Sequence, residues 1–298
     1  MSGKNAETPS CWGIFREAEH SPGREADDAE ILKETGRKLT AAGFAVTFHT
    51  PAQILGQREA LPSLAFAMCE GLPALERLRQ WESRGVCIVN SARAVSNTHR
   101  EASLPLLERA GIPTPESLVI DTGGSLPRGR QEESLFGACW VKQASEHKTR
   151  EGDVLFAADR TSVLKALDRL RDRSLPRAVV QRHVAGDVVK FYGVGAPPPA
   201  SDADLTSDAL WFQWFYPREH PVTGHAFDER AFRTVACRAA RSLGLDVWGG
   251  DAIITPEGQT FVIDLNAWPS FALYRDPASS HIASHLAARL RRFAGVSA

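Results

Sequence analysis

Cysteine is scarce in this sequence, and long apolar runs are absent from it. The five cysteines, at positions 11, 69, 87, 139 and 237, are scattered, without a C-x-x-C pair or a metal-type spacing. This pattern excludes a disulfide framework and a zinc site, so we expect reduced thiols in the core. Because no apolar stretch reaches the length of a membrane helix and none follows Lys4 closely, we expect neither a membrane span nor a signal peptide. The expected compartment is the cytoplasm.

The chain also lacks an excess of charge of either sign. It carries 35 Lys and Arg against 36 Asp and Glu, a formal net charge of -1 at pH 7. Such a balance excludes a general attraction to nucleic acid or to acidic membranes, so any anion site must be local. Hydrophobic residues make up 43% and charged residues 24%, as in ordinary soluble globular proteins. A length of 298 residues indicates two or three packed lobes.

Short apolar runs alternate with helical patterns in the first part of the chain. Strands are predicted from the runs CWGIF, AVTFHT, LAFAMC and GVCIV. Helices are predicted over Glu25–Ala42 and over the segment PALERLRQWESR. This alternation predicts an open α/β domain over residues 1–95.

The rest of the chain predicts a central lobe over residues 96–180 and a C-terminal lobe over residues 181–298. Helices are expected over Asn97–Ala110, Arg160–Arg173 and Glu229–Leu243 and after Ser279. Strands are expected from SLVI, ACWVK, DVLFA, AVVQRHV, DVVKFYGVG and WFQWFY. The linker APPPASDADLTSDA has the composition of a loop. The last strands, DAIIT and TFVIDLN, are joined by a hairpin turn.

The final hairpin carries the clearest chemical signal. Its strands are antiparallel, so Asp251 at the start of one is expected beside Asp264 and Asn266 at the end of the other. Asp264 and Asn266 are two residues apart and therefore share a face. Two carboxylates and an amide oxygen suit magnesium that bridges nucleotide phosphates. The alternative is a solvated strand end with turn-forming Asp and Asn.

Two other strand ends carry polar residues that suit a nucleotide. Lys142 ends the apolar strand ACWV, where its charge can neutralise phosphate oxygens, although an edge lysine with its ammonium in water is the simpler explanation. Gln181 follows the apolar run AVV, where it could contact a nucleotide. On its own, this position could equally be an ordinary strand end. The order of these features along the chain strengthens each of them.

That order resembles the ATP-grasp superfamily from about residue 90 to residue 271. The matching segments are NSARAV, ERAGIPTP, WVKQ, VVQRHVAGDVVKFYGVG, LGLDVWGGDAII and FVIDLNAWPSF. The resemblance implies an α/β fold of the α+β ATP-grasp type, in which an N-terminal pre-ATP-grasp domain precedes two lobes with ATP between them. It assigns phosphates to Lys142 and Arg100, adenine to Gln181 and the backbone of His183 and Val184, ribose or the metal region to Asp187, and magnesium to Asp251, Asp264 and Asn266.

The loop after Lys142 departs from the ligases of this superfamily. Those ligases usually have a Gly-rich phosphate loop there, whereas QASEHKTREGDV contains Gly152 alone. Its His147 and Thr149 have a spacing similar to that of the inositol-trisphosphate kinase branch, which also uses a lysine at the position of Lys190. A polyphosphate substrate would require a denser basic cluster than this sequence shows.

The function indicated is an ATP- and Mg²⁺-dependent carboxylate-amine ligase acting through an acyl phosphate, with Mn²⁺ as the alternative ion. Lys190 and Arg218 would hold the tetrahedral intermediate, and His147 would steer the acceptor in a kinase. The alternatives are a small-molecule kinase and an inactive nucleotide-binding subunit. The expected acceptor is an amino acid, a peptide or a phosphorylated polyol. A homodimer is an open expectation, and neither nucleic acid nor membrane is an expected partner.

Overall fold

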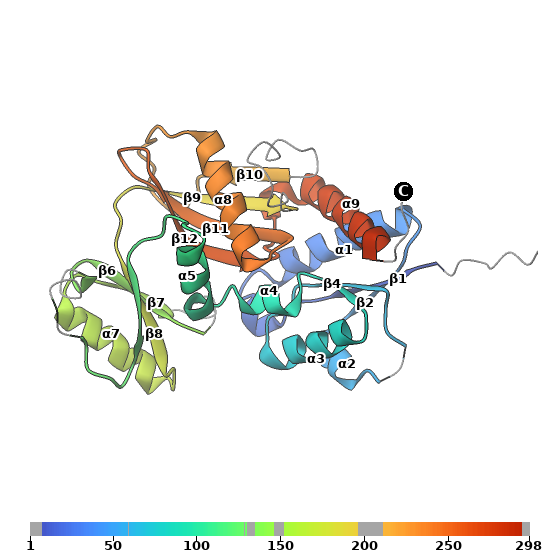
Figure 1. The fold of residues 1–298 in the computed structure, drawn as a ribbon, viewed down its shortest axis with the longest axis horizontal. Helices are drawn as coiled ribbons and strands as arrows, with labels where there is room; N and C mark the ends of the chain where they lie inside the picture. The colour runs from blue at the N-terminus through green and yellow to red at the C-terminus, as the bar shows by residue number, and fades with distance from the viewer. Residues whose placement is uncertain are drawn as a thin grey trace, which may run out of the picture.

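The computed structural model describes residues 8–58, 60–127, 129, 135–145, 152–195 and 211–293. In these ranges the chain forms three four-stranded sheets with helices packed on them (Figure 1). The architecture is therefore mixed α/β, as predicted. All five cysteines are buried and unpaired, which confirms the expectation of core thiols. Within the described ranges, the helices are too short or too polar to cross a membrane.

The N-terminal sheet is parallel and has the strand order β2-β1-β3-β4. Its strands are β1 (Ser10–Ile14), β2 (Ala45–His49), β3 (Leu64–Ala67) and β4 (Cys87–Val89). The helices between them are α1 (Glu25–Ala41), α2 (Pro51–Gly56) and α3 (Leu72–Ser83). Parallel neighbours require crossover connections, and these three helices supply them. The predicted open α/β arrangement is present, with the short α2 as an addition.

The central unit is an antiparallel sheet of order β5-β8-β6-β7, with one helix against it. Its elements are β5 (Ser117–Asp121), β6 (Cys139–Gln143), β7 (Val154–Ala157), α7 (Arg160–Asp172) and β8 (Arg177–Arg182). Helix α7 begins at a capping box between Asp159 and Ser162 and buries Val163, Leu167 and Leu170. These side chains belong to a core whose buried members, among the described residues, lie between Leu126 and Val180, with Leu118 and Ile120 of β5 packed against it.

The C-terminal sheet is antiparallel and has the order β10-β9-β11-β12. Its strands are β9 (Asp187–Val194), β10 (Trp211–Phe215), β11 (Val247–Ile254) and β12 (Thr260–Ala267). Helix α8 (Glu229–Leu243) is capped by Asp228 and ends at Gly244, whose φ is +80°. It buries Phe232, Ala236 and Leu243, which share one face of the helix.

Three further helices are described, and the last of them packs against α1 near the start of the chain. They are α4 (Ala92–Ser96), α5 (Arg100–Arg109) and α9 (Arg275–Phe293), with 3₁₀ turns at Ala18–His20 and Ala272–Tyr274. Helix α9 lies against α1 (Figure 1), and its Ile282 and Leu286 share a core with Ile31 and Leu32. The last helix therefore completes the N-terminal domain, although it lies at the far end of the sequence.

Several boundaries differ from the sequence-based expectations. Helix α5 starts at Arg100 rather than Asn97 because α4 ends at Ser96 and a turn separates the two. Helix α9 starts at Arg275, before Ser279. Strand β8 continues to Arg182, past the boundary that we expected at residue 180. The division into three domains at residues 95 and 180 stays a prediction.

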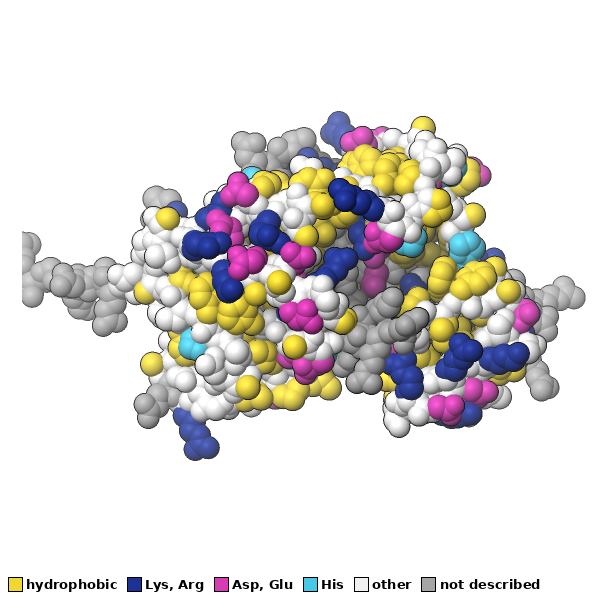
Figure 2. Space-filling model, turned by 180° about the vertical axis from the view of Figure 1, so that it is seen from behind, with side chains coloured by type: hydrophobic (Ala, Val, Ile, Leu, Met, Phe, Trp, Pro, Cys, Tyr) yellow, Lys and Arg dark blue, Asp and Glu magenta, His cyan; other side chains and the backbone are white. Residues whose placement is uncertain are grey.

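The surface between the central unit and the rest of the molecule is hollowed. The space-filling view from behind shows this hollow between the central unit and the larger body (Figure 2). On this face the acidic and basic side chains of the larger body are interspersed, in keeping with the net charge of -1 (Figure 2). Any anion site of the protein must therefore come from a few specific residues.

Candidate active site

Three charged side chains form a row across the C-terminal sheet. Lys190 on β9 is directly opposite Asp251 on β11, which is directly opposite Asp264 on β12. Directly opposed residues of antiparallel strands point to the same face, so the three side chains lie side by side. The distance from Lys190 Nζ to Asp251 Oδ1 is 3.7 Å. This register confirms the expected meeting of Asp251 with Asp264.

The strand that carries Asp251 is longer than the sequence indicated. β11 begins at Val247, so Asp251 lies in the middle of the strand and not at its start. Gly249 and Gly250 interrupt the apolar pattern from which the strand was predicted. Both positions require glycine because the neighbouring strands pack closely against them. A Cβ atom on Gly250 would lie 2.3 Å from the carbonyl oxygen of Asp264. Gly249 is opposite Asn266, two residues after Asp264 on β12. The side-chain amide of Asn266 therefore lies on the same face of the sheet as the carboxylate of Asp264.

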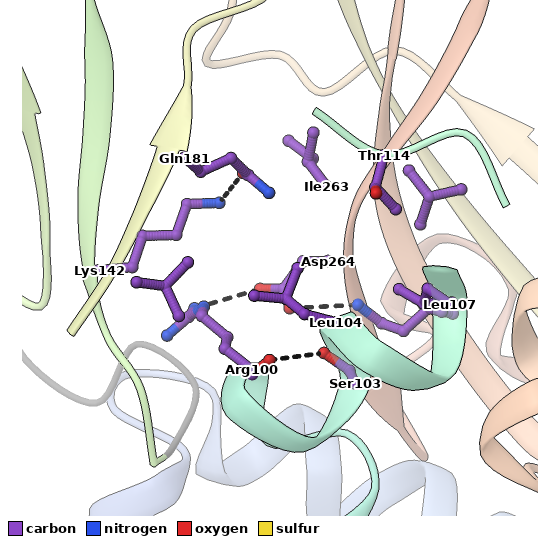
Figure 3. Close-up of a pocket in the computed structure, with 12 residues that line it drawn as sticks. Arg100, Ser103, Leu104, Leu107, Thr114, Lys142, Gln181, Ile263 and Asp264 are labelled. Atoms are coloured by element: carbon purple, nitrogen blue, oxygen red, sulfur yellow. Dashed lines mark hydrogen bonds and ion pairs between the residues drawn. The ribbon is translucent and has the colours of Figure 1, made fainter. Parts of the chain in front are cut away.

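A bulge in β12 separates the acidic row from the end of the hairpin. Asp251 is paired with Asp264, whereas the next residue, Ala252, is paired with Val262. Ile263 is therefore the extra residue, and its side chain faces the cavity beside Asp264 (Figure 3). The bulge places an apolar surface next to the carboxylate, which suits a site where a flat ring and a phosphate chain are bound together.

The central unit contributes a buried lysine to the opposite wall. Lys142 on β6 is 7% exposed, and its Nζ donates a hydrogen bond to Gln181 Oε1 on β8 at 2.7 Å (Figure 3). Gln181 in turn donates to Ser117 Oγ at 3.2 Å. Burial lowers the pKa of Lys142 to about 8, although Asp264 and Asp251 oppose the shift. An ammonium group in such a place, bonded to a neutral amide, is suited to bind an anion.

Arg100 connects the two walls from α5. Its Nη2 is 3.2 Å from Asp264 Oδ2 (Figure 3). Its Nη1 donates to the carbonyl oxygen of Gln143 at 3.1 Å. Arg100 is 6% exposed, so both contacts are shielded from water. The predicted phosphate-binding cation is thus at the site, but it is bonded to a predicted metal ligand. Nothing in the sequence pattern indicated that pairing.

A small cavity lies between these groups. It is lined by residues of α5, β6, β8 and β12, among them Arg100, Lys142, Gln181 and Asp264 (Figure 3). Its volume is about 20 Å³, enough for about one water molecule. A nucleotide would need the central sheet to move away from the C-terminal sheet, and the separate core of the central unit allows such a movement as a rigid body.

The predicted adenine-binding residues lie at the end of β8. His183 is exposed, its backbone N–H donates to the carbonyl oxygen of Ala138 at 2.9 Å, and its ring accepts from Trp140 Nε1 at 3.2 Å. Val184 is half-buried one residue further along the chain. The adenine contacts of these residues stay a prediction.

Asp187 has a different environment from the one expected. Its buried carboxylate accepts hydrogen bonds from the backbone N–H groups of Thr223, Gly224 and His225 at 2.7 to 2.9 Å. Burial opposes ionisation, but these three bonds outweigh it and hold the pKa of Asp187 below its ordinary value. The carboxylate fixes a loop, and a contact with ribose would require it to give up some of these bonds.

The remaining predicted residues are divided between exposed and undescribed parts. Arg218 is exposed in the loop after β10. His147 and Thr149 lie outside the described residues, as does the linker 196–209. One residue that sequence reasoning missed is Glu219, whose Oε1 is 3.8 Å from Lys190 Nζ. No sequence motif marks it, because only the folding of the loop onto β9 brings it there.

The donor set of the acidic row fits a magnesium ion. Burial raises the pKa of Asp251, and Asp264 beside it adds to the shift, so a cation between the two carboxylates would relieve both effects. All three candidate donors, Asp251, Asp264 and Asn266, offer oxygen. Among the described side chains, no group of three or more His, Cys, Asp or Glu could hold a metal alone. Phosphate and water oxygens would therefore have to complete the coordination.

Comparisons with known proteins agree with this arrangement. No family model matches the chain. A curated relative, the probable alpha-L-glutamate ligase of Pasteurella multocida (strain Pm70), is 25% identical over 251 residues, covering 82% of this chain and 76% of the relative.

Solved structures resemble the chain over nearly its whole length. The D-alanine-D-alanine ligase of Coxiella burnetii aligns with a TM-score of 0.72 at 13% identity over 97% of each chain. The ATP-grasp ligase PsnB, complexed with a minimal precursor, Mg and ADP, aligns with a TM-score of 0.62 at 19% identity, over 95% of this chain and 98% of PsnB. The chain therefore has the ATP-grasp fold, as its motifs predicted.

Proposed function

We propose that this chain is an ATP- and magnesium-dependent carboxylate-amine ligase that acts through an acyl phosphate. The observation that carries the proposal is the row of Lys190, Asp251 and Asp264 on one face of the C-terminal sheet. The buried Lys142 lies across the cavity from this row. A metal-binding surface opposite a phosphate-binding lysine is the arrangement that phosphoryl transfer requires.

The chain's own residues would position the reactants and neutralise their charge. Lys142 and Arg100 would bind phosphate oxygens, and Gln181 would keep Lys142 in place while offering its amide to the adenine end. Asp251, Asp264 and Asn266 would hold magnesium, which when bound supplies charge neutralisation at the β- and γ-phosphates.

The reaction then proceeds in two steps. A carboxylate oxygen of the first substrate attacks the γ-phosphorus, and ADP leaves with the electron pair of the broken P–O bond. The amine nitrogen of the second substrate attacks the acyl carbon, and inorganic phosphate leaves. Lys190, on the same face as the metal ligands, would stabilise the oxyanion of the tetrahedral intermediate, with Arg218 as the second cation.

The comparisons favour a ligase over the kinase and the inactive subunit. The curated relative is named a glutamate ligase, one structural neighbour is named a D-alanine-D-alanine ligase, and PsnB is an ATP-grasp ligase that was also solved with a precursor peptide. The kinase alternative depended on the spacing of His147 and Thr149, which lie outside the described residues, and on the position of Lys190. An amino acid or a peptide is therefore the proposed acceptor, and Mg²⁺ is the proposed ion.

A product screen tests the proposal. The protein is incubated with ATP, Mg²⁺ and pools of amino acids, peptides or inositol phosphates, while ADP release is followed and the products are weighed by mass spectrometry. A ligase joins two substrates with loss of water and forms one ADP for each bond. A stable product that has gained one phosphate, or no ATP turnover with any pool, would contradict the proposal.

A further inference from the structure

The loop over residues 216–225 is held beside the acidic row at both ends. It begins after β10, whose last residue, Phe215, is directly opposite Lys190. It ends on the carboxylate of Asp187, which lies on the same strand, three residues before Lys190. Gly224 has φ of +82°, a left-handed conformation that glycine adopts easily, and this allows its N–H to point at Asp187. Both anchors of the loop therefore belong to β9.

Glu219 extends from this loop towards Lys190. Its carboxylate is 3.8 Å from Lys190 Nζ, and its side chain is 57% exposed, so one side of the carboxylate is open to water. Its own backbone N–H and the nearby Lys190 hold the pKa of Glu219 below its ordinary value, with smaller contributions from His220 and Arg24. Glu219 is thus an ionised carboxylate at the edge of the reaction site.

The balance of charge changes when the substrates bind. In the free protein, Lys190 lies between two carboxylates, those of Asp251 and Glu219. In the proposed ligase, Asp251 binds magnesium, and Lys190 turns to the oxyanion. Glu219 then loses the lysine that it contacts, so that only the smaller influence of Arg24 and His220 remains, and it lies next to an acyl phosphate that is itself negative. This position favours a cation that arrives from solvent on the open side of the loop.

We propose that Glu219 binds the ammonium group of the amine substrate and so selects charged primary amines as the nucleophile; this inference rests on the ligase function proposed above. The bound ammonium loses one proton to solvent. Its nitrogen lone pair then attacks the acyl carbon, the C–O bond to phosphate breaks, and phosphate leaves with that electron pair and takes up the second proton that the nitrogen gives up. Glu219 itself is unchanged, and its role is to bind and place the amine.

A partition experiment tests this role within one reaction mixture. Hydroxylamine, which is uncharged in slightly alkaline solution, is added together with a mixture of the protein amino acids, ATP and Mg²⁺. The common acyl phosphate then forms either a hydroxamate or an amide, and mass spectrometry gives the ratio of the two. This ratio depends only on the second step, so slower phosphoryl transfer or partial unfolding of a variant does not affect it.

Glu219→Gln should raise the hydroxamate-to-amide ratio about tenfold, the effect of losing one charged hydrogen bond. Glu219→Lys, which repels ammonium, should raise it further. Glu30→Gln is the matched control, because Glu30 is also an exposed glutamate beside a lysine, at 3.2 Å from Lys33 on α1. It should leave the ratio unchanged.

The outcomes separate the two proposals. A ratio that Glu219→Gln and Glu219→Lys do not change overturns the role of Glu219, while the ligase function stands. Equal loss of hydroxamate and amide also overturns it, because Glu219 would then act only by holding Lys190. If the unaltered protein forms neither hydroxamate nor amide, the ligase function itself fails, and the role of Glu219 fails with it.

Discussion

Lys142 and Lys190 both face the candidate active site, but their surroundings are opposite. Lys142 is buried in the central unit and bonded to the neutral amide of Gln181, and burial lowers its pKa to about 8. Lys190 is partly exposed on the C-terminal sheet and lies between the carboxylates of Asp251 and Glu219.

The difference indicates how each half of the site works. Among the described residues of the central sheet, the hydrogen-bond partner of Lys142 is the neutral Gln181, so this half gains most when a phosphate binds. The C-terminal half is already neutralised, and its carboxylates must exchange a lysine or arginine for a metal ion. We therefore expect the central half to control nucleotide affinity and the C-terminal half to control the chemical step.

Removing one carboxylate of the C-terminal half should have the largest effect. Asp264→Asn should lower kcat by about a thousandfold because magnesium loses a charged ligand. Asparagine still offers an oxygen to Arg100, so the melting curve should stay cooperative. Steady-state rates and thermal melts check both points. A folded Asp264→Asn variant with nearly full activity would show that the acidic row is not the metal site.

Removing the charge of the central half should weaken nucleotide binding. Lys142→Met should raise the KM for ATP by about a hundredfold, from the loss of a charge-assisted contact in a buried place. Lys142→Arg keeps the charge and should raise the KM for ATP much less. Titration of ATP against each variant measures the effect. If Lys142→Met left the KM unchanged and lowered only kcat, the division of labour between the two halves would be wrong.

The pKa of Lys142 also predicts how stability depends on pH. In the folded protein this pKa is about 8, below the ordinary value of 10.5. Between these values Lys142 binds more protons in the unfolded chain than in the folded protein, so the contribution of Lys142 to stability should rise with pH in this window. Burial of the charge costs on the order of 3 kcal/mol below pH 8, at about 1.4 kcal/mol per pKa unit.

The melting temperature of Lys142→Met, measured against the unaltered protein at several pH values, isolates this contribution. The melting temperature of the variant should exceed that of the unaltered protein by most below pH 8. This difference should become smaller as the pH rises towards 10.5. Gln181 loses its hydrogen-bond donor in the variant, which reduces the gain at every pH equally. A difference that does not vary with pH would mean that Lys142 titrates normally.

The smallest effect is expected from the loop anchor. Asp187→Asn should lower kcat/KM for the amine substrate about fivefold, because a neutral amide holds the backbone of Thr223 and His225 less strongly. The KM for ATP should change little, since Asp187 fixes the loop and does not touch the cavity. An increase in the KM for ATP alone would instead support the predicted contact of Asp187 with ribose.

The sequence predicted the elements that depend on local pattern. The opposition of Asp251 and Asp264 follows from a short hairpin, and the placement of Lys142 follows from an apolar strand that ends in a charge. The contacts that it could not predict are between segments far apart in the chain. Arg100 bonds to Asp264 from a different helix, and α9 packs on α1. Such contacts depend on how the sheets pack, which no periodic pattern encodes.

Gly249, Asp187 and Glu219 illustrate the same limit. Two adjacent glycines break an apolar pattern, so β11 seemed to begin at Asp251, although tight packing against β9 and β12 requires them. A G-D pair before a strand resembled a nucleotide contact, but the carboxylate turns to a loop more than thirty residues further along. Glu219 has no motif at all and acquires its place only through that loop.

The central claim is that a carboxylate is activated as an acyl phosphate at the row of Lys190, Asp251 and Asp264. Transfer of ¹⁸O from the carboxyl group of the first substrate into the released phosphate tests it most directly, once the product screen has identified that substrate. We predict one ¹⁸O atom in each phosphate formed by the unaltered protein and no labelled phosphate above background with Asp264→Asn. Unlabelled phosphate from a productive ligation, or label retained in a phosphorylated product, would contradict the account.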